Sequence, residues 1–320
     1  MSTGLIIGKF MPPHAGHLRL CVAAAAQVDA LHVILFSKAA EPIPGTLRLD
    51  WLRELLPEAH LANITAEHAV NFDDAQAWDF WVNSIRGVLP CDPDVVFSSE
   101  PYGDELARRL GARHVAVDPA RTQVPISATQ IRAEPMTYWR YIPAPVRPYF
   151  ARRVAVVGAS CSGKTTLARA LAEAFKTVCV PEYAREYLQD RGQPCTPADL
   201  RVIAGRQAAL EDELARQANC VLICDTNLLT TQLWHEHYCG DCPADLRDLA
   251  RQRTADLTLL CDAGVPWEAD RLRDARESRA WFQQRFEAEL TAQGRPWVHL
   301  RGPAEARRQA AIQCVAGVVA

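Results

Sequence analysis

Short apolar runs alternate with helix-length segments along most of the chain. The runs 5–7 and 31–36 are typical of buried strands, and the Ala-rich segment 18–27 between them predicts a helix. Apolar positions at helical spacing predict further helices over 46–56 and 74–88. The remaining runs that predict strands are 95–97, 114–117, 153–157, 178–180, 221–224, 257–260 and 297–300. Strands separated by helix-length segments indicate an α/β protein built on parallel sheets.

The segment 135–150 interrupts this alternation. Prolines recur through it together with aromatic residues, which is typical of a packed connector between domains. The chain has 320 residues, which is long for a single hydrophobic core. We therefore predict two domains, 1–146 and 147–320.

Composition narrows the class of protein. A net charge of −3 gives no general electrostatic footprint for nucleic acid or a membrane surface. No apolar stretch approaches the ~18 residues that a membrane-spanning helix needs, and the N-terminus has no secretory-type apolar region. The 11 cysteines lie scattered through apolar segments, as free thiols of a reducing compartment do. We expect a cytoplasmic protein that binds neither nucleic acid nor membrane.

The first chemical motif is His-Ala-Gly-His at 14–17, which follows the first predicted strand. Two imidazoles three positions apart at a helix start, His14 and His17, form a phosphate site with the helix N-terminus. Adenylyl transfer depends on positioning and positive charge, with little covalent work for the protein. The segment 126–132 adds two hydroxyl groups and a guanidinium, on Ser127, Thr129 and Arg132.

These residues closely resemble the HxGH nucleotidyltransferase superfamily, which segment 8–17 matches well. The resemblance implies a Rossmann-like domain in which His14, His17 and Arg132 bind the triphosphate of ATP. It also implies that segment 98–103 is a nucleotide-contacting loop. The further residues that it assigns to the nucleotide are Gly8, Lys9, Phe10, Ser127 and Thr129.

A second motif, Gly-x-x-x-x-Gly-Lys-Thr at 158–165, follows the predicted strand 153–157 and precedes a helix. This is the context that a Walker A motif requires, so the second domain is predicted to be a P-loop NTPase-type kinase. Lys164 would bridge the phosphates of ATP, and Thr165 would hold Mg²⁺. The residues of the loop that we assign to ATP are Gly158, Ser160, Ser162, Gly163, Lys164, Thr165 and Thr166.

Charged residues elsewhere in this half suit phosphoryl transfer. Asp225 ends a predicted strand, as a metal-binding Walker B carboxylate does, although it could instead cap the next helix. Glu182 would take the proton of the acceptor hydroxyl or bind a ribose hydroxyl; the sequence leaves open whether Glu182 or Asp225 is the base. The arginine-rich segment 270–279 predicts a lid that places Arg273 on the transferred phosphoryl group, with a solvated charged helix as the alternative.

The order of the two motifs resembles the bifunctional nicotinamide-nucleotide adenylyltransferase and ribosylnicotinamide kinase family, over essentially the whole chain. Its specific marks are Pro-Glu-Tyr-Ala-Arg-Glu-Tyr at 181–187, Cys-Asp-Thr-Asn at 224–227 and Tyr-Trp-Arg-Tyr-Ile-Pro at 138–143. The resemblance implies that nicotinamide riboside is phosphorylated to the mononucleotide (NMN), which then reacts with ATP to give NAD and pyrophosphate. A pyridinium cation favours aromatic faces. The candidates, each of which could instead be a core residue, are Trp78, Trp81, Tyr183 and Trp234, with Tyr187 and Tyr238 beside them.

Other interpretations remain at this stage. Some members of the family carry an N-terminal helix-turn-helix that represses transcription; here the first strand begins within five residues of Met1, so we expect no such domain. A fused phosphopantetheine adenylyltransferase and dephospho-CoA kinase has the same two motifs in the same order. A nucleotide sensor with weak transferase activity is a further alternative. The oligomeric state is open, and a homo-oligomer is compatible with the sequence.

Overall fold

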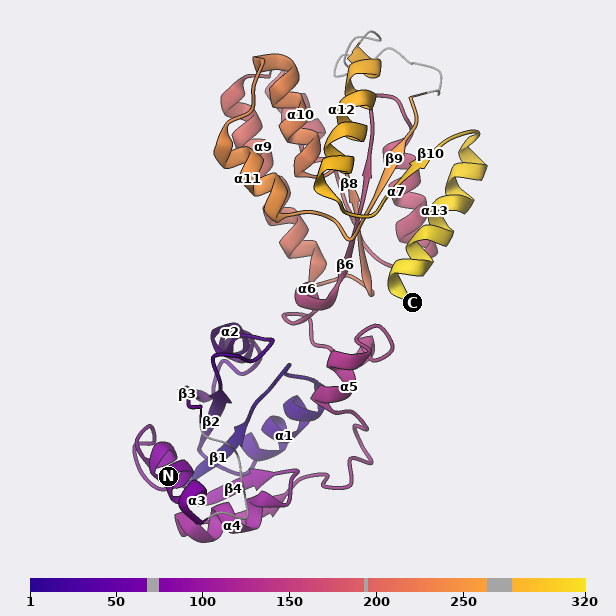
Figure 1. The fold of residues 1–320 in the computed structure, drawn as a ribbon. Helices are drawn as coiled ribbons and strands as arrows, with labels where there is room; N and C mark the ends of the chain where they lie inside the picture. The colour runs from indigo at the N-terminus through magenta and orange to yellow at the C-terminus, as the bar shows by residue number, and fades with distance from the viewer. Residues whose placement is uncertain (68–74, 193–194, 264–277) are drawn as a thin grey trace. The chain divides into compact units, whose positions relative to one another are not determined.

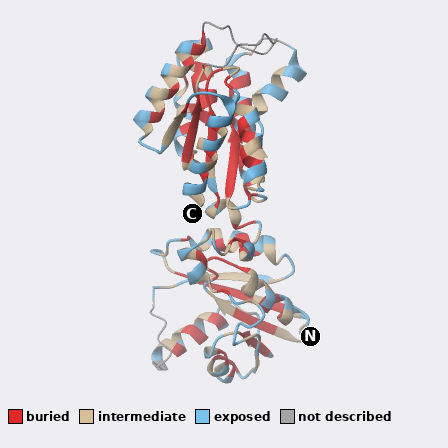
Figure 2. Ribbon diagram, turned by 90° about the vertical axis from the view of Figure 1, so that its right-hand side faces the viewer, coloured by how far each residue is buried: buried red, intermediate tan, exposed pale blue. Residues whose placement is uncertain are grey.

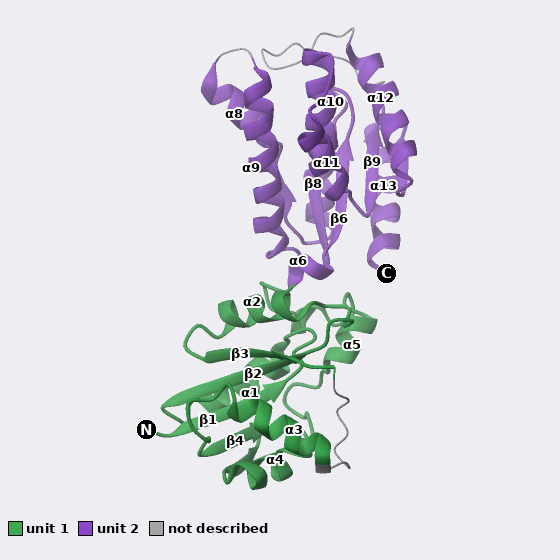
Figure 3. Cartoon of the chain, turned by 60° about the vertical axis from the view of Figure 1, so that its left-hand side comes forward, with its two compact units in different colours: residues 1–146 green, residues 147–320 purple. Residues whose placement is uncertain are grey.

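The computed structural model describes residues 1–67, 75–192, 195–263 and 278–320. The chain divides into two compact units, Met1–Val146 and Arg147–Ala320 (Figure 3). Each unit is built on one five-stranded sheet whose neighbouring strands are all parallel (Figure 1). The predicted fold class, α/β with two parallel-sheet domains, is confirmed.

In unit 1 the strand order is β3-β2-β1-β4-β5, so the first strand lies at the centre. On β1, Leu5 packs against α3 and α4, whereas Ile6 packs against α1 and α2 on the other face. The strands are β1 (Thr3–Gly8), β2 (Ala30–Ser37), β3 (His60–Thr65), β4 (Val95–Ser98) and β5 (Arg113–Ala116). The helices are α1 (Ala15–Ala25), α2 (Gly45–Leu55), α3 (Ala75–Arg86), α4 (Tyr102–Leu110) and α5 (Ala128–Ala133). Because helices cover both faces, a ligand is expected at the carboxyl ends of the strands, where connections leave β1 in opposite directions.

In unit 2 the order is β10-β9-β6-β8-β7, and again the first strand of the unit is central. On β6, Val154 and Val156 pack against α7 and α13, while Ala155 and Val157 pack against α10 and α12. Figure 2 shows the central strands of this unit as buried. The strands are β6 (Arg152–Val157), β7 (Cys179–Val180), β8 (Val221–Asp225), β9 (Leu257–Cys261) and β10 (Trp297–Leu300). The helices are α6 (Arg147–Phe150), α7 (Lys164–Ala174), α8 (Tyr183–Arg191), α9 (Pro197–Ala215), α10 (Leu228–Cys239), α11 (Ala244–Gln252), α12 (Ser278–Gln293) and α13 (Ala304–Val319).

Several elements differ from the sequence prediction, and two of these differences have a physical reason that the structure shows. Helix α1 begins three residues earlier than predicted, because its cap is a histidine rather than one of the usual capping residues. Strand β3 was not predicted, because His-Leu-Ala-Asn-Ile-Thr has no continuous apolar run and lies at the sheet edge with partly exposed side chains. The connector is packed as predicted through Trp139, Ile142 and Val146, which are all buried. Among the described residues, no helix has both the length and the apolar character needed to cross a membrane.

Two candidate phosphate-binding sites

The site of unit 1 lies where β1 ends and α1 begins. His14 caps the helix, because its Nδ1 accepts a hydrogen bond from the backbone N–H of Gly16 at 3.1 Å. The ring of His17 lies 3.8 Å from that of His14, between centroids, and 4.8 Å from that of Phe10. The structure therefore brings both motif histidines together at a helix N-terminus, which is a favourable place for a phosphate group.

Burial keeps both imidazoles neutral at pH 7. Desolvation, assisted by the positive charge of Arg121, lowers the pKa of His14 to about 4. The pKa of His17 is lowered well below its ordinary value by burial, then by His14 and Arg121. Nδ1 of His17 is buried without a hydrogen-bond partner among the described residues. Since nearby negative charge favours the protonated form, a bound triphosphate would raise the pKa of both side chains.

The second segment of the transferase motif reaches the same loop. Arg132 on α5 donates to the carbonyl oxygen of Met11, and its Nη2 donates to the hydroxyl of Thr129 at 3.2 Å. Ser127 caps α5, and its hydroxyl accepts from the backbone N–H of Gln130 at 3.2 Å. Two segments more than a hundred residues apart thus meet at the carboxyl end of β1.

An ion-pair cluster around the buried side chain of Arg48, which the sequence did not reveal, supports this loop. Arg48 is completely buried; its Nη2 lies 2.5 Å from a carboxylate oxygen of Glu41, and its Nη1 donates to the carbonyl of Lys9 at 2.6 Å. Nζ of Lys9 lies 3.1 Å from Glu41. The ammonium of Lys9 is therefore paired with Glu41 here, and a nucleotide would have to compete with that carboxylate for it.

Three aromatic residues assigned from the sequence are core residues. Phe10 is only 1% exposed and lies beneath His17, so its backbone rather than its ring is left for a nucleotide contact. Trp78 and Trp81 are 5% and 7% exposed and belong to the core between the sheet and α3. Because neither indole leaves a face open for stacking in this conformation, we correct their assignment as pyridinium-binding residues.

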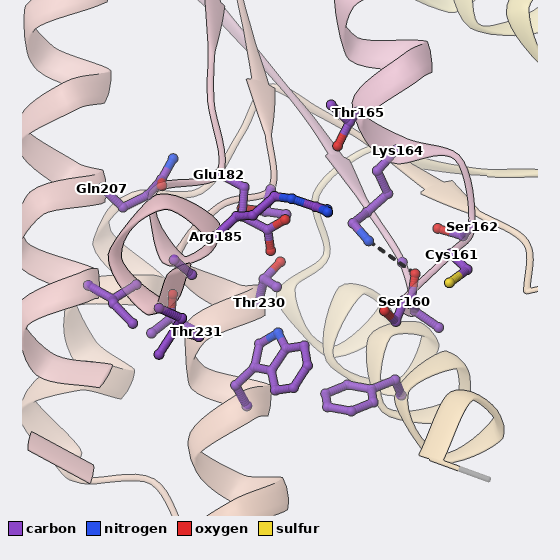
Figure 4. Close-up of a pocket in the computed structure, with 18 of the residues that line it drawn as sticks. Ser160, Cys161, Ser162, Lys164, Thr165, Glu182, Arg185, Gln207, Thr230 and Thr231 are labelled. Carbon is purple, nitrogen blue, oxygen red and sulfur yellow. Dashed lines mark hydrogen bonds between the residues drawn. The ribbon is translucent and has the colours of Figure 1, made fainter. Parts of the chain in front are cut away.

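The site of unit 2 is a cavity of about 1200 Å³ at the carboxyl ends of the central strands. Residues 158–166 line it together with residues from α8, α9, α10 and α12. In Figure 4 the side chains of the P-loop lie on one side of this space, and those of Glu182, Arg185 and Gln207 on the other. The cavity is thus bounded by a phosphate-binding loop on one wall and by carboxylate and amide groups on the opposite wall.

The P-loop has the backbone shape that its motif predicts. Gly158 has φ 141°, and a Cβ there would lie 2.6 Å from the carbonyl oxygen of Cys261. Nζ of Lys164 donates to the carbonyl of Ala159 at 3.0 Å, within the loop itself. The hydroxyl of Ser162 is buried without a partner among the described residues. An unpaired hydroxyl and an ammonium held by a loop carbonyl are groups that a bound phosphate would satisfy.

Two carboxylates face the loop. Asp225, at the end of β8, is 3% exposed, and one of its oxygens, Oδ1, has no hydrogen-bond partner within the described chain. Burial raises its pKa, against the opposing effects of the Thr165 hydroxyl and Lys164. Burial likewise raises the pKa of Glu182; Lys164 opposes this and Asp225 adds to it. The alternative role of Asp225 as a helix cap is not seen, because Asn227 occupies the cap position of α10.

The opposite wall carries polar groups that the sequence did not single out. Oε1 of Gln207 accepts from the backbone N–H of Tyr183 at 3.0 Å, which leaves its buried Nε2 as a donor without a partner in the described structure. The hydroxyl of Thr230 is also buried and has no hydrogen-bond partner among the described residues. Trp234 lines the cavity and stacks on Tyr238, with 5.3 Å between ring centroids. Nothing in the sequence singles out Gln207, because it is one polar residue within an ordinary helical pattern.

Two assignments from the sequence remain, Tyr183 and Arg273. Tyr183 lines a separate, shallower hollow with Tyr187 and Arg191, so we correct its assignment as a stacking residue of the main cavity. Arg273 lies outside the described residues. Arg279, at the end of the same arginine-rich segment, lies at the start of α12, where it donates to the carbonyl of Ala263.

Known proteins resemble both halves of the chain. A family model described as an AAA domain matches residues 153–307. The nicotinamide-nucleotide adenylyltransferase of Pyrococcus furiosus is 28% identical over 137 residues, which are 41% of this chain and 72% of the relative. A solved structure of NadR protein in complex with NR has the same fold, with a TM-score of 0.81 at 22% identity, covering 99% of this chain and 95% of that one.

Relatives that span both units are known as well. The trifunctional NAD biosynthesis/regulator protein NadR of Escherichia coli (strain K12) is 35% identical over 301 residues. The match covers 87% of this chain and 73% of the relative. The resemblance inferred from the two motifs is thereby confirmed, and the chain belongs to the NadR family.

Proposed function

We infer that the chain is a bifunctional enzyme of NAD biosynthesis. One unit phosphorylates nicotinamide riboside with ATP to give NMN, and the other transfers the adenylyl group of ATP to NMN, giving NAD and pyrophosphate. The observation that carries this inference is the presence of two complete phosphate-binding motifs, each at the carboxyl end of a central strand, in a member of the NadR family. The fused phosphopantetheine and dephospho-CoA enzyme shares the motifs, and the experiment below distinguishes it.

In the kinase site, the P-loop binds the phosphates of ATP through its backbone N–H groups. The ammonium of Lys164, which donates to the carbonyl of Ala159 within the loop, donates to a phosphate oxygen instead when ATP binds. Glu182 lines the cavity together with Lys164, and it accepts the proton of the riboside hydroxyl as that oxygen attacks the γ-phosphorus. The bond from the γ-phosphorus to the bridging oxygen breaks, and ADP leaves.

A magnesium ion fits beside this loop. The Asp225 carboxyl has an unpaired buried oxygen and interacts with the hydroxyl of Thr165, and Mg²⁺ prefers such hard oxygen ligands. Asp225 and Thr165 would hold the ion, which would offset the negative charge of the phosphates. This assignment leaves Glu182 as the base.

The wall opposite the P-loop suits the nicotinamide riboside acceptor. Trp234 offers an aromatic face to the pyridinium cation, and the Glu182 carboxylate, which lines the same cavity, favours a positive charge. The unpaired Nε2 of Gln207 and hydroxyl of Thr230 are available for the polar groups of the riboside.

In the transferase site, a phosphate oxygen of NMN attacks the α-phosphorus of ATP and pyrophosphate leaves. We propose that His14, His17 and Arg132 bind the triphosphate and stabilise the charge that develops on the leaving group. Ser127 and Thr129 present hydroxyl groups from the start of α5. Because the two imidazoles are neutral before binding, they enter as hydrogen-bond groups and gain positive charge as the anion raises their pKa.

The two reactions release different products, which makes them separable in one sample. ADP forms only in the proposed kinase step, and pyrophosphate only in the transferase step. Lys164→Ala should abolish ADP formation from nicotinamide riboside and ATP while pyrophosphate formation from NMN and ATP continues. His17→Ala should do the reverse, with transferase turnover lowered by ~10² or more.

The same two variants can also contradict the proposed function. Loss of both activities in either variant, with an unchanged melting temperature, would contradict two independent sites. ADP formation with dephospho-CoA but not with nicotinamide riboside would replace our assignment with the fused coenzyme A enzyme.

A further inference from the structure

A buried arginine from the last helix reaches the P-loop. Arg307, in the first turns of α13, is 7% exposed. Its Nη1 donates to the carbonyl oxygen of Ser162 at 2.9 Å, a buried bond that spans 145 positions of sequence. Its Nη2 lies 3.7 Å from the point that a Cβ on Gly163 would occupy. The guanidinium therefore lies against the peptide that joins Ser162 to Gly163.

The charge of Arg307 has no acidic partner in the described part of the chain. Its contact there is the neutral carbonyl of Ser162, and its Nε is buried without a partner. The next residue, Arg308, shows the ordinary arrangement: it is partly exposed and pairs with Glu305 at 2.7 Å. A buried cation without a counter-ion is unfavourable, so the position of Arg307 needs an explanation beyond packing.

The positive charges of Arg307 and of the P-loop lysine, Lys164, both affect the residue Cys261. Burial raises the pKa of Cys261 to about 11, and the charges of Lys164 and Arg307 both oppose that effect. The backbone carbonyl of Cys261 in turn lies against Gly158, at the start of the loop. Two cations thus flank the loop, and only Lys164 of the two is among the residues that line the cavity.

The geometry of the peptide gives Arg307 a specific effect. In a planar trans peptide, the C=O and N–H groups point in opposite directions. The C=O of Ser162 points at Arg307, which is not among the residues that line the cavity. The N–H of Gly163 therefore points away from Arg307. Ser162 and Gly163 themselves line the cavity, and Gly163 is the residue that precedes α7. N–H groups at this position are those that a P-loop offers to phosphate.

We propose that Arg307 is a positioning residue for ATP in the kinase site. It holds the Ser162–Gly163 peptide with its N–H turned toward the phosphates, and it places directly behind that peptide a positive charge that has no acidic partner among the described residues. The inference rests on the proposed function in one respect: the P-loop binds ATP as the phosphate donor.

The test compares two neighbouring arginines in the full-length protein. Arg307→Met keeps an apolar stem but removes the charge and the donors, and Arg308→Met is the control on the exposed face of the same helix turn. A hydrogen bond from a charged donor corresponds to about tenfold to a hundredfold in a binding constant. We therefore expect Arg307→Met to raise the KM for ATP by about that factor, measured by ADP formation. The KM for nicotinamide riboside, and pyrophosphate formation from NMN, should remain as in the wild type.

A conservative variant separates positioning from packing. Arg307→Lys restores a positive charge and a donor group, so it should recover part of the affinity for ATP. An unchanged KM for ATP in a folded Arg307→Met protein would overturn the proposal. Equal increases in both KM values, together with a lower melting temperature without nucleotide, would also overturn it, because they indicate a structural role. If Arg307→Met does not fold, Arg307→Gln replaces it under the same criteria.

Binding of AMP-PNP, followed by calorimetry, tests the inference without any acceptor. The kinase site is the one whose binding is lost in Lys164→Ala, and Arg307→Met should weaken that same site. If the wild type fails to phosphorylate nicotinamide riboside but Arg307→Met still weakens this site, the proposed acceptor is wrong and the role of Arg307 stands. If AMP-PNP binds both proteins equally, the role of Arg307 is refuted whatever the acceptor.

Discussion

Acidification should destabilise unit 1 through His14, and one substitution should remove the effect. The imidazole is buried in its neutral form, with its pKa lowered from 6.5 to about 4. Between these two values the unfolded chain binds a proton that the folded chain does not. Protonation then favours unfolding, so the stabilising effect is fully present above pH 6.5 and is lost as the pH falls toward 4.

The size of the effect follows from the two pKa values. Complete loss corresponds to about 3.4 kcal/mol in the free energy of unfolding, at about 1.36 kcal/mol for each pH unit. Between pH 7.5 and pH 5 the expected loss is about 2 kcal/mol for this side chain. His14 is only 5% exposed, so solvent screening reduces this little. His17, whose pKa is also lowered, adds a loss of the same sign.

His14→Asn is the matched variant. Asparagine does not titrate, and it is a good helix cap whose side-chain oxygen can replace Nδ1 in the bond to Gly16. Hydrogen exchange of peptides from β1 and β2, corrected for the intrinsic rates at each pH, reports the stability of unit 1 within the full chain. The wild type should lose about 2 kcal/mol more protection than the variant between pH 7.5 and pH 5, while peptides from β8 serve as the control.

Two results would refute this reasoning. Parallel losses of protection in the wild type and His14→Asn would mean that His14 does not supply the proton linkage. Equal protection at both pH values in the wild type would mean that the folded imidazole titrates normally. Saturating ATP should reduce the difference between the proteins, because a bound triphosphate favours the protonated imidazole.

Two further predictions concern the kinase site. Glu182→Gln removes the proton acceptor but keeps the shape of the side chain, so kcat for ADP formation should fall by ~10²–10⁴ if Glu182 is the base. A raised KM with kcat retained would indicate ribose binding instead. Because burial raises the pKa of Glu182, wild-type kinase activity should decline on acidification at a higher pH than the ordinary pKa of 4.5 implies. Gly158→Ala places a Cβ 2.6 Å from the Cys261 carbonyl oxygen, at a backbone φ of 141°. The catalytic efficiency of the kinase with ATP should therefore fall by about tenfold or more, while pyrophosphate formation serves as the internal control. Wild-type kinase kinetics in this variant would show that the loop shifts without loss of activity.

The sequence predicted the elements whose signals are local. The apolar runs of both central strands, the small residues of the P-loop and the histidine pair are all readable within a few positions, and each lies where it was expected. Strand β3 was missed because its pairing with β2 rather than its own composition makes it a strand. Sequence spacing also put Trp78 and Trp81 on one helix face, but only the fold shows that this face packs on the sheet.

The residues that sequence reasoning missed act over long distances. Gln207, Arg48 and Arg307 each contact backbone groups of a motif from 24, 39 and 145 positions away. An isolated arginine or glutamine in a helix carries no local mark of such a contact. The cytoplasmic location, the absence of DNA binding and the oligomeric state stay predictions from the sequence.

The contact between the last helix and the P-loop has a consequence for how the protein is made. The loop lies near the start of unit 2, but the side chain that holds its Ser162 carbonyl belongs to α13 and is synthesised 145 positions later. A nascent chain therefore gains this support of the P-loop backbone only after α13 has been synthesised. A premature stop between the motif and α13 would leave every residue of the phosphate motif in place and still remove the support of its backbone.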